Sequence, residues 1–146
     1  VTRFKPLTRC NVKTMPHPGF PTDMQPQMAV LLSVAKGTSI LSESVWDNRF
    51  QYVGQLLRMG ANIQVDGKIA VIEGVDHLTG VKVKATDLRA GAAMVIAGLI
   101  AKGETVVEKI QYVDRGYENI VEKLTQLGAD IKRVQVQADS SVAHAG

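Results

Sequence analysis

The sequence contains a single cysteine, and this scarcity limits the class of protein it can encode. Cys10 has no second cysteine to pair with, so a framework of internal disulfide bonds is excluded. No histidine stands next to it in the chain, and we interpret it as a bystander rather than a reactive thiol. One unpaired cysteine suits a reducing compartment, so we expect a cytoplasmic protein.

The sequence also lacks an apolar run long enough to cross a bilayer. The longest run, Ala90 to Ala101, is about a dozen residues between Arg89 and Lys102, whereas a membrane-spanning helix needs ~20. We therefore expect no membrane partner. The chain has no signal peptide and opens on Val1 rather than on methionine, so we expect a processed or excised piece of a longer protein.

Metal-ligand motifs and basic stripes are absent as well. His17, His77 and His144 are spread without the spacing of a metal site, so we expect neither a metal nor a cofactor. The formal charge is +3 and the isoelectric point is near 9.1, but the basic residues are scattered and are not interleaved with aromatic ones. We expect no nucleic-acid partner, whereas anionic small molecules fit this charge.

What the sequence does contain is the composition of a folded domain. It has 146 residues, of which 45% are apolar and 21% are charged. This composition is typical of globular proteins, and this length allows one domain with a sizeable core.

An internal repeat organises the chain. Matching segments recur in the same order, at an offset that drifts only from 64 to 68 residues. The pairs are Thr22-Asp23-Met24 with Thr86-Asp87-Leu88, Lys36-Gly37 with Lys102-Gly103, Asn48-Arg49 with Asp114-Arg115, and 56–63 with 124–131. Such a long period predicts two copies of one supersecondary unit, and we divide the chain into a first unit with a leading strand (1–75), a second unit (76–135) and a flexible polar tail (136–146).

Each copy alternates between helical and strand periodicity. The first helix of each copy has apolar residues at helical spacing on one face and further apolar residues on its other faces, so we expect this helix to be buried on all sides. The predicted elements are helices 24–35 and 88–101, strands Thr38–Trp46 and Thr105–Val113, amphipathic helices Tyr52–Met59 and Tyr117–Leu127, and strands Asn62–Val65, Ile69–Glu73 and Asp130–Val134. This pattern predicts an α/β domain.

Asp23 is the first candidate functional residue, and the pattern around it allows two interpretations. Thr22-x-x-Gln25 is a capping box, and an acid in the first turn of a helix stabilises it by ~0.3–1 kcal/mol. The alternative is a proton acceptor in catalysis. In the second copy the residue that corresponds to Gln25 of the capping box is Arg89. A cation in the first turn of a helix is opposed by the helix dipole, and local violations of this kind tend to mark function.

Two arginines that precede amphipathic helices form a second candidate site. Arg115 stands between a predicted strand and a helix, and Arg49 is its counterpart in the first copy. Each could form a loop ion pair with a neighbouring aspartate, Asp114 or Asp47. Each could equally bind a phosphate or carboxylate through two parallel hydrogen bonds.

Longer motifs carry a family resemblance over about residues 8–134. They are "PHPGFPTDMQPQ", "DNRF", "LRMGA", "TDLRAGAAMVIAGLIAKGETVV" and "DRGYENIVEKLTQLGADI". Together they resemble the C-terminal third of the UDP-N-acetylglucosamine 1-carboxyvinyltransferases, the enolpyruvyl transferases that commit a nucleotide sugar to peptidoglycan. The resemblance implies an inside-out α/β barrel in which apolar helices point inward beneath outer sheets. It also implies that this chain holds two of the three repeated helix-strand-helix-strand units of one domain, which is therefore incomplete.

The resemblance implies a reaction as well. Enolpyruvyl transferases of this family add the sugar 3′-hydroxyl to C2 of phosphoenolpyruvate and then eliminate phosphate. The implied roles are Asp23 as the base that bonds the hydroxyl, Asp87 as a second active-site aspartate with Arg89 beside it, Arg115 as a phosphoenolpyruvate ligand, and Val45 and Trp46 as neighbours of the nucleotide sugar. A base within hydrogen-bond reach and fixed cations suit this chemistry. We expect Asp23 both to cap its helix and to accept the proton.

The resemblance is incomplete, and alternatives remain. Cys10 lacks the sequence context of the family's reactive cysteine, and the lysine and other arginines that bind phosphoenolpyruvate have no counterpart here. One alternative is an enzyme like 3-phosphoshikimate 1-carboxyvinyltransferase, which "PHPGFPTDMQ" and "DRGYE" disfavour. Another is a non-catalytic binding or scaffold module. We expect the two substrates to be shared with a missing domain, and we expect an uncovered apolar edge that promotes self-association.

Overall fold

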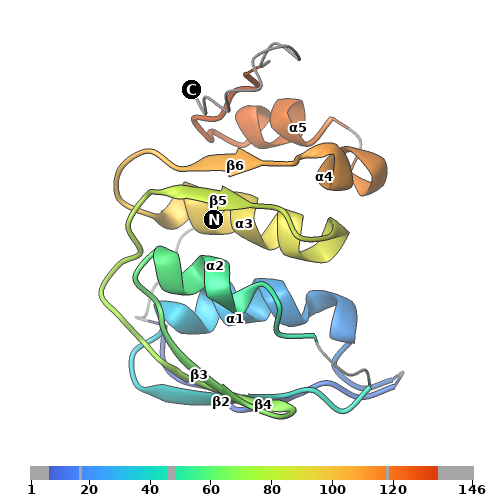
Figure 1. Ribbon diagram of the computed structural model, residues 1–146, viewed down its shortest axis with the longest axis vertical. Helices are drawn as coiled ribbons and strands as arrows, with labels where there is room; N and C mark the ends of the chain where they lie inside the picture. Colours follow the sequence, from blue (N-terminus) through green and yellow to red (C-terminus); the bar gives the residue numbers. More distant parts are fainter. Residues whose placement is uncertain (1–6, 17, 46–48, 118, 135–146) are drawn as a thin grey trace.

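The structure, a computed structural model, describes residues 7–16, 18–45, 49–117 and 119–134 (Figure 1). The elements are β1 (Val12–Lys13), the 3-10 turn η1 (Thr22–Met24), α1 (Gln25–Ser33), β2 (Thr38–Ser42), α2 (Val53–Arg58), β3 (Asn62–Asp66), β4 (Ile69–Glu73), β5 (Lys82–Lys84), α3 (Leu88–Ile100), β6 (Val106–Glu108), α4 (Gln111–Gly116) and α5 (Ile120–Gln126). They form the mixed α/β arrangement that the sequence predicts.

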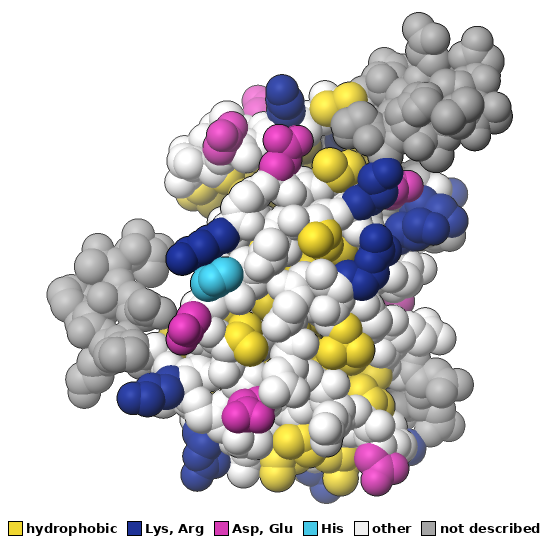
Figure 2. All heavy atoms as spheres, turned by 60° about the vertical axis from the view of Figure 1, so that its left-hand side comes forward, with side chains coloured by type: hydrophobic (Ala, Val, Ile, Leu, Met, Phe, Trp, Pro, Cys, Tyr) yellow, Lys and Arg dark blue, Asp and Glu magenta, His cyan; other side chains and the backbone are white. Residues whose placement is uncertain are grey.

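A four-stranded sheet closes one end of the molecule, with the strand order β1-β2-β4-β3. β1 runs parallel to β2, whereas β4 is antiparallel to both β2 and β3. The predicted hairpin between β3 and β4 is confirmed, and Gly67 takes the positive φ of 60° that its turn requires. Hydrophobic side chains also reach the surface at this end (Figure 2), and Ile40, Ile69 and Val71 are among the exposed ones.

The core lies between the inner face of this sheet and the helices. α1 packs on β2 and β4, and α3 packs along α1, so the helices stack above the sheet in Figure 1. The largest fully buried apolar side chains are Leu32, Leu41, Tyr52, Leu56, Met59, Ile72, Leu78 and Met94. Alternation along β4, where Ala70 and Ile72 are buried and their neighbours are exposed, is the period-2 pattern of a half-buried strand.

The two halves of the chain share local geometry. Lys36 and Lys102 each follow an apolar helix, and each forms a parallel bridge with an earlier segment, at Thr8 and Thr79 respectively. β5 runs parallel to β6 as β1 runs parallel to β2. The glycines that end the amphipathic helices also correspond, because Gly60 and Gly128 have φ values of 93° and 99°.

The second half departs from the predicted elements in two strands. The predicted strand Thr105–Val113 is wrong beyond β6, because Lys109 adopts a left-handed φ of 59° and the chain then turns into α4. The predicted strand Asp130–Val134 is also wrong, since residues 130–134 pair with no strand in the described part of the chain. A lone strand has no hydrogen-bond partners to stabilise it. The sequence analysis missed β5.

Three further predictions need smaller corrections. The strand Thr38–Trp46 is shorter, ending at Ser42, and the helix Tyr117–Leu127 begins only at Ile120, after Asn119 with a φ of 52°. α1 and α3 are not buried all round. The exposed apolar side chains on them are Leu31, Ile96, Leu99 and Ile100, at 38–44%. Trp46 and the tail 136–146 lie outside the described residues.

Candidate functional site

Three of the predicted site residues, Asp23, Asp87 and Arg89, lie where α1 and α3 begin. These two helices pack side by side, and their N-terminal ends lie at the same side of the molecule in Figure 1. Asp23 lies in η1, immediately before α1, whereas Asp87 and Arg89 lie at the start of α3. The segments around Asp23 and Asp87, which are far apart in the sequence, therefore lie close together in the fold.

An ion pair joins the two helix ends. The Nε atom of Arg89 donates to Oδ1 of Asp23 at 2.5 Å. Both side chains are accessible, at 65% for Asp23 and 36% for Arg89, and exposed pairs of this kind contribute only ~0–1 kcal/mol to stability. The pair therefore fixes geometry more than it stabilises the fold, and it gives Arg89 a partner that its own helix does not supply.

The capping role belongs to Asp87 and not to Asp23. Oδ1 of Asp87 accepts a hydrogen bond from the backbone N–H of Ala90 at 2.8 Å, which is an N-cap of α3. The predicted capping box of Thr22 and Gln25 is wrong, because neither η1 nor α1 has a side-chain cap. Both side chains instead bind a third residue, Glu43.

Glu43 is a buried carboxylate that accepts several hydrogen bonds. Its side chain is 2% exposed. Thr22 Oγ1 and Gln25 Nε2 each donate to its Oε1 at 2.8 Å, and the backbone N–H of Val45 donates to its Oε2 at 3.0 Å. Burying a charge is costly unless hydrogen bonds satisfy it, so this network explains how a glutamate can lie beneath the Asp23 turn.

Tyr52 extends the network into the core. Its hydroxyl donates to Oε1 of Gln25 at 2.5 Å. Burial raises the pKa of the Tyr52 phenol well above its usual range, and the negative charge of Glu43 raises it further. The phenol therefore stays protonated and donates to Gln25, whose amide in turn donates to Glu43.

The sequence analysis missed Glu43 and Tyr52, although a signal for Glu43 was present. Ser39, Leu41 and Glu43 alternate at period 2, and all three are buried. Along a strand this spacing places side chains on one face. A charged residue in phase with a core leucine was therefore recognisable as an inward-facing carboxylate.

Two further predicted residues, Val45 and Arg115, lie near this end. Val45 is half-buried and is held through its backbone by Glu43. Arg115 lies in the last turn of α4, not in a loop, because the predicted strand before it is interrupted. The residue after it, Gly116, packs so closely on Leu88 that an added Cβ would lie 2.3 Å from the leucine side chain. Arg115 thus stands next to the start of α3.

Asp114, the neighbour proposed as a partner for Arg115, binds a different arginine. Nη1 of Arg133 donates to Oδ2 of Asp114 at 2.9 Å, and Nη2 donates to Oδ1 at 2.7 Å. These hydrogen bonds hold the pKa of the Asp114 carboxyl below its usual value. The bidentate pair ties α4 to the chain beyond α5.

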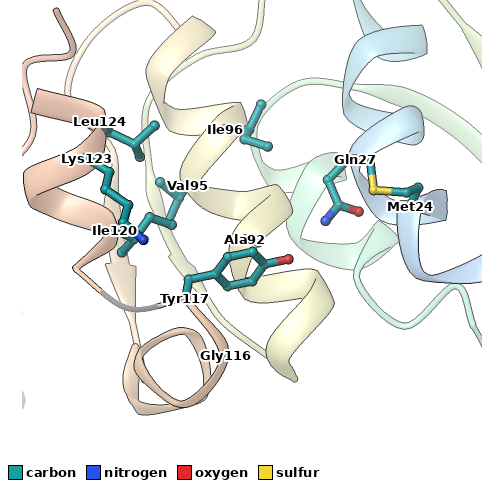
Figure 3. Close-up of a pocket in the computed structure, with 10 residues that line it drawn as sticks. All are labelled: Met24, Gln27, Ala92, Val95, Ile96, Gly116, Tyr117, Ile120, Lys123 and Leu124. Atoms are coloured by element: carbon teal, nitrogen blue, oxygen red, sulfur yellow. The ribbon is translucent and has the colours of Figure 1, made fainter. Parts of the chain in front are cut away.

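A groove of about 600 Å³ runs along α3 from this end (Figure 3). Its lining residues are Met24 and Gln27 from the α1 side, Ala92, Val95 and Ile96 of α3, and Gly116, Tyr117, Ile120, Lys123 and Leu124. Tyr117 and Ala92 both line this groove. Met24 and Gly116 directly follow Asp23 and Arg115 in the chain, so polar groups stand at the end of a largely apolar groove.

In residues 7–16, 18–45, 49–117 and 119–134, no three acidic, histidine or cysteine side chains are grouped so as to hold a metal ion. Among the same residues, no helix has the length and hydrophobicity to span a bilayer.

The amino-acid sequence of the chain matches a known protein family and several known proteins. Residues 2–124 match the family model of EPSP synthase (3-phosphoshikimate 1-carboxyvinyltransferase). The chain is 65% identical over 131 residues to UDP-N-acetylglucosamine 1-carboxyvinyltransferase 1 of Clostridium perfringens, covering 90% of the chain and 30% of that protein. It is 57% identical to the UDP-N-acetylglucosamine 1-carboxyvinyltransferase of Desulfofundulus thermocisternus, covering 88% of the chain and 53% of that protein.

Solved structures resemble the chain too. The enolpyruvyl transferase NikO of Streptomyces tendae aligns over 92% of the chain and 31% of its own, with a TM-score of 0.82 and 34% identity. An EPSP synthase of Acinetobacter baumannii aligns over 70% of the chain and 24% of its own, with a TM-score of 0.53 and 21% identity. The chain thus spans about 30% of the length of most relatives it matches.

Proposed function

The chain belongs to the EPSP synthase family and has an enolpyruvyl transferase-like α/β fold, and on this premise we propose that the full-length protein transfers enolpyruvate from phosphoenolpyruvate to the 3′-hydroxyl of UDP-N-acetylglucosamine. The observation that carries the proposal is the 65% identity with a UDP-N-acetylglucosamine 1-carboxyvinyltransferase over 90% of the chain. The EPSP synthase structure of Acinetobacter baumannii shares only 21% identity with the chain. This reaction would be the committed step of peptidoglycan synthesis, in the cytoplasm.

The charged end of α1 and α3 suits the first half of this reaction. As the sugar oxygen bonds to C2 of phosphoenolpyruvate, the C2–C3 double bond opens, C3 takes up a proton, and the hydroxyl proton passes to a base. Loss of phosphate together with a C3 proton then restores the double bond. We assign the role of the base to Asp23, whose carboxylate is accessible and uses one oxygen to bind Arg89. The second oxygen can accept the hydroxyl proton while Arg89 keeps the carboxylate in place.

Arg115 and Arg89 supply positive charge for the anionic substrates in this proposal. Arg115 binds phosphoenolpyruvate, and its support is its place beside the start of α3. Asp87 is the second active-site aspartate, and the cap it forms fixes its orientation. Val45 borders the nucleotide sugar. Trp46, beside it, keeps the same assignment, although it lies outside the described residues.

The architecture we propose is part of an inside-out α/β barrel. Two of its three repeated units make up the chain, at 1–75 and 76–135. The support is the local geometry that both halves share, in the parallel bridges of Lys36 and Lys102 and in the pairing of β1 with β2 and β5 with β6. We propose that the 146-residue chain alone is inactive, because both domains must enclose the substrates.

A direct assay tests this function. Purified full-length protein is expected to release phosphate when it is given phosphoenolpyruvate with UDP-N-acetylglucosamine, and to release none with 3-phosphoshikimate. Phosphate release that occurs with 3-phosphoshikimate as the acceptor, but not with UDP-N-acetylglucosamine, would support the alternative transferase. If phosphate is released with neither acceptor, the protein is not a transferase, and the remaining alternative is a non-catalytic binding module. Titration of the nucleotide sugar against the 146-residue chain then measures whether the chain binds it.

A further inference from the structure

We propose that Glu43 is a positioning residue for this site, and the proposal rests on the function proposed above. Its buried carboxylate links the turn that carries Asp23 to the backbone at Val45. One side chain would thereby set the positions of the proton acceptor and of the segment assigned to the nucleotide sugar at the same time.

The direction of the hydrogen bonds explains why this position needs a carboxylate. The Thr22 hydroxyl, the Gln25 amide and the Val45 N–H all act as donors toward Glu43. An ionised carboxylate is an acceptor only, with two oxygens that can receive all three. A glutamine at this position has one carbonyl oxygen and one NH₂ group. Its NH₂ group would therefore face at least one of the three donors, and that pair could not form a hydrogen bond.

The Asp23 turn is attached to its surroundings through two adjacent side chains. η1 is a single turn without a side-chain cap. The Asp23 carboxylate is held by Arg89 from the neighbouring helix, and the Thr22 hydroxyl holds the turn to Glu43 from beneath. Two attachments on adjacent residues, to different partners, define where the carboxylate points.

The other end of the link is also fixed. Thr14, which is fully buried, accepts a hydrogen bond from the N–H of Ser44 at 2.9 Å, and its own N–H donates to Ser42. The segment on either side of Glu43 is therefore anchored to the chain next to β1. Glu43 transmits this fixed position to the turn of Asp23.

A purely structural role for the same hydrogen bonds predicts a different outcome. If the role is purely structural, loss of a hydrogen-bonded hydroxyl from η1 or from α1 should lower stability without a specific effect on turnover. Ser33 provides the matched control, because it is fully buried and its Oγ donates to the backbone oxygen of Ala29 at 2.7 Å. It makes no contact with Glu43 in the hydrogen bonds described.

The first experiment compares Thr22→Val, Thr22→Ser and Ser33→Ala in the full-length protein. Thr22→Val removes one hydroxyl with little change of shape. We expect kcat to fall at least about tenfold, because small misplacements of a catalytic group are costly, while the nucleotide-sugar Kd stays within about twofold. Thr22→Ser should restore kcat. Ser33→Ala should lower the melting temperature comparably and leave kcat unchanged. Equal kcat for Thr22→Val and Ser33→Ala would overturn the proposal.

The second experiment does not depend on turnover. Hydrogen exchange is followed in wild-type protein and in Glu43→Gln, with β3 and β4 as the internal reference. We expect the Val45 amide to exchange about tenfold faster, because it loses its hydrogen-bond partner. We expect the Met24 amide, which donates to Pro21 within the turn, to exchange faster as well, because the turn loses its attachment to Glu43. Unchanged exchange in either segment would overturn the link. If wild-type protein lacks turnover, the proposed function fails, but this measurement still decides whether Glu43 joins the two segments.

Discussion

At the scale of single residues, two aspartates in matching positions have different structural tasks. Asp87 caps α3, whereas Asp23 reaches across to Arg89. The difference follows from their neighbours, because Thr22 and Gln25 are drawn to Glu43 and leave no cap for α1. Sequence matching alone could not separate these tasks.

Replacing Asp23 by asparagine isolates its chemistry. Because the Asp23–Arg89 pair is exposed, the change should cost at most ~1 kcal/mol of stability. In the full-length protein we expect a large fall in kcat with a nearly unchanged melting temperature and nucleotide-sugar affinity. Asp66→Asn, at an exposed position at the end of β3, is the control and should change neither. Equal losses of stability and kcat in Asp23→Asn would show a structural role only.

Arg115→Lys tests the proposed phosphoenolpyruvate ligand. Lysine keeps the charge but loses the planar group, and a hydrogen bond to a charged partner is worth ~1.5–3 kcal/mol. The affinity of the full-length protein for phosphoenolpyruvate should fall by about ten- to a hundredfold, while nucleotide-sugar binding stays nearly constant. Separate titrations of the two substrates measure this. Unchanged phosphoenolpyruvate affinity in Arg115→Ala would remove the residue from the site.

At the scale of elements, α3 depends on a glycine where it meets its neighbours. A Cβ added at Gly91 would lie 2.5 Å from Cγ2 of Val113 in α4 and 3.0 Å from the Cβ of Ala85. A Cβ contact of 2.5 Å essentially never occurs in proteins, so the glycine allows α4 to pack onto the start of α3. That packing also sets the position of Arg115.

Gly91→Ala should therefore destabilise the protein. We expect a loss of ~1–3 kcal/mol from overpacking, measured by denaturant unfolding of the 146-residue chain. Gly54→Ala is the matched control in α2, because no atom lies within 4 Å of its added Cβ. That change should stabilise the chain by ~0.5–1 kcal/mol. A neutral Gly91→Ala would mean that α4 can move away without cost.

The elements also show what the sequence could predict and why. α3 and the β3–β4 hairpin follow from local signals, namely an apolar run and an Asp66-Gly67 turn, and both are confirmed. The strand Thr105–Val113 failed because its β-branched residues indicate a strand, whereas the backbone at Lys109 turns the chain. The Asp23–Arg89 contact could not be predicted, since nothing local joins residues so far apart.

At the scale of the whole molecule, apolar surface lies along the stacked helices. Leu31, Ile96, Leu99 and Ile100 are 38–44% exposed, and the groove along α3 is lined mostly by apolar side chains. Monomers rarely expose contiguous apolar patches beyond a few hundred Å². This surface supports the proposal that the 146-residue chain self-associates.

Sedimentation measures that self-association. We expect the average mass of the 146-residue chain to rise with concentration, and we expect Ile96→Glu to shift it toward the monomer because a charge opposes apolar contact. Lys68→Gln, in the turn between β3 and β4, lowers the net charge by the same one unit, so it is the control and should leave the average mass unchanged. A strictly monomeric species at high concentration, without binding of hydrophobic dyes, would contradict the expectation.

The contact between Asp23 and Arg89 has a consequence for the order of folding. The two residues are separated by 66 positions, and closing so long a loop costs chain entropy before the contact forms. Local structure such as the β3–β4 hairpin can form early, on the microsecond scale of hairpins. The charged end of the site exists only after α3 has docked beside α1, so the ability to bind an anion there should return late in refolding, together with the burial of α3.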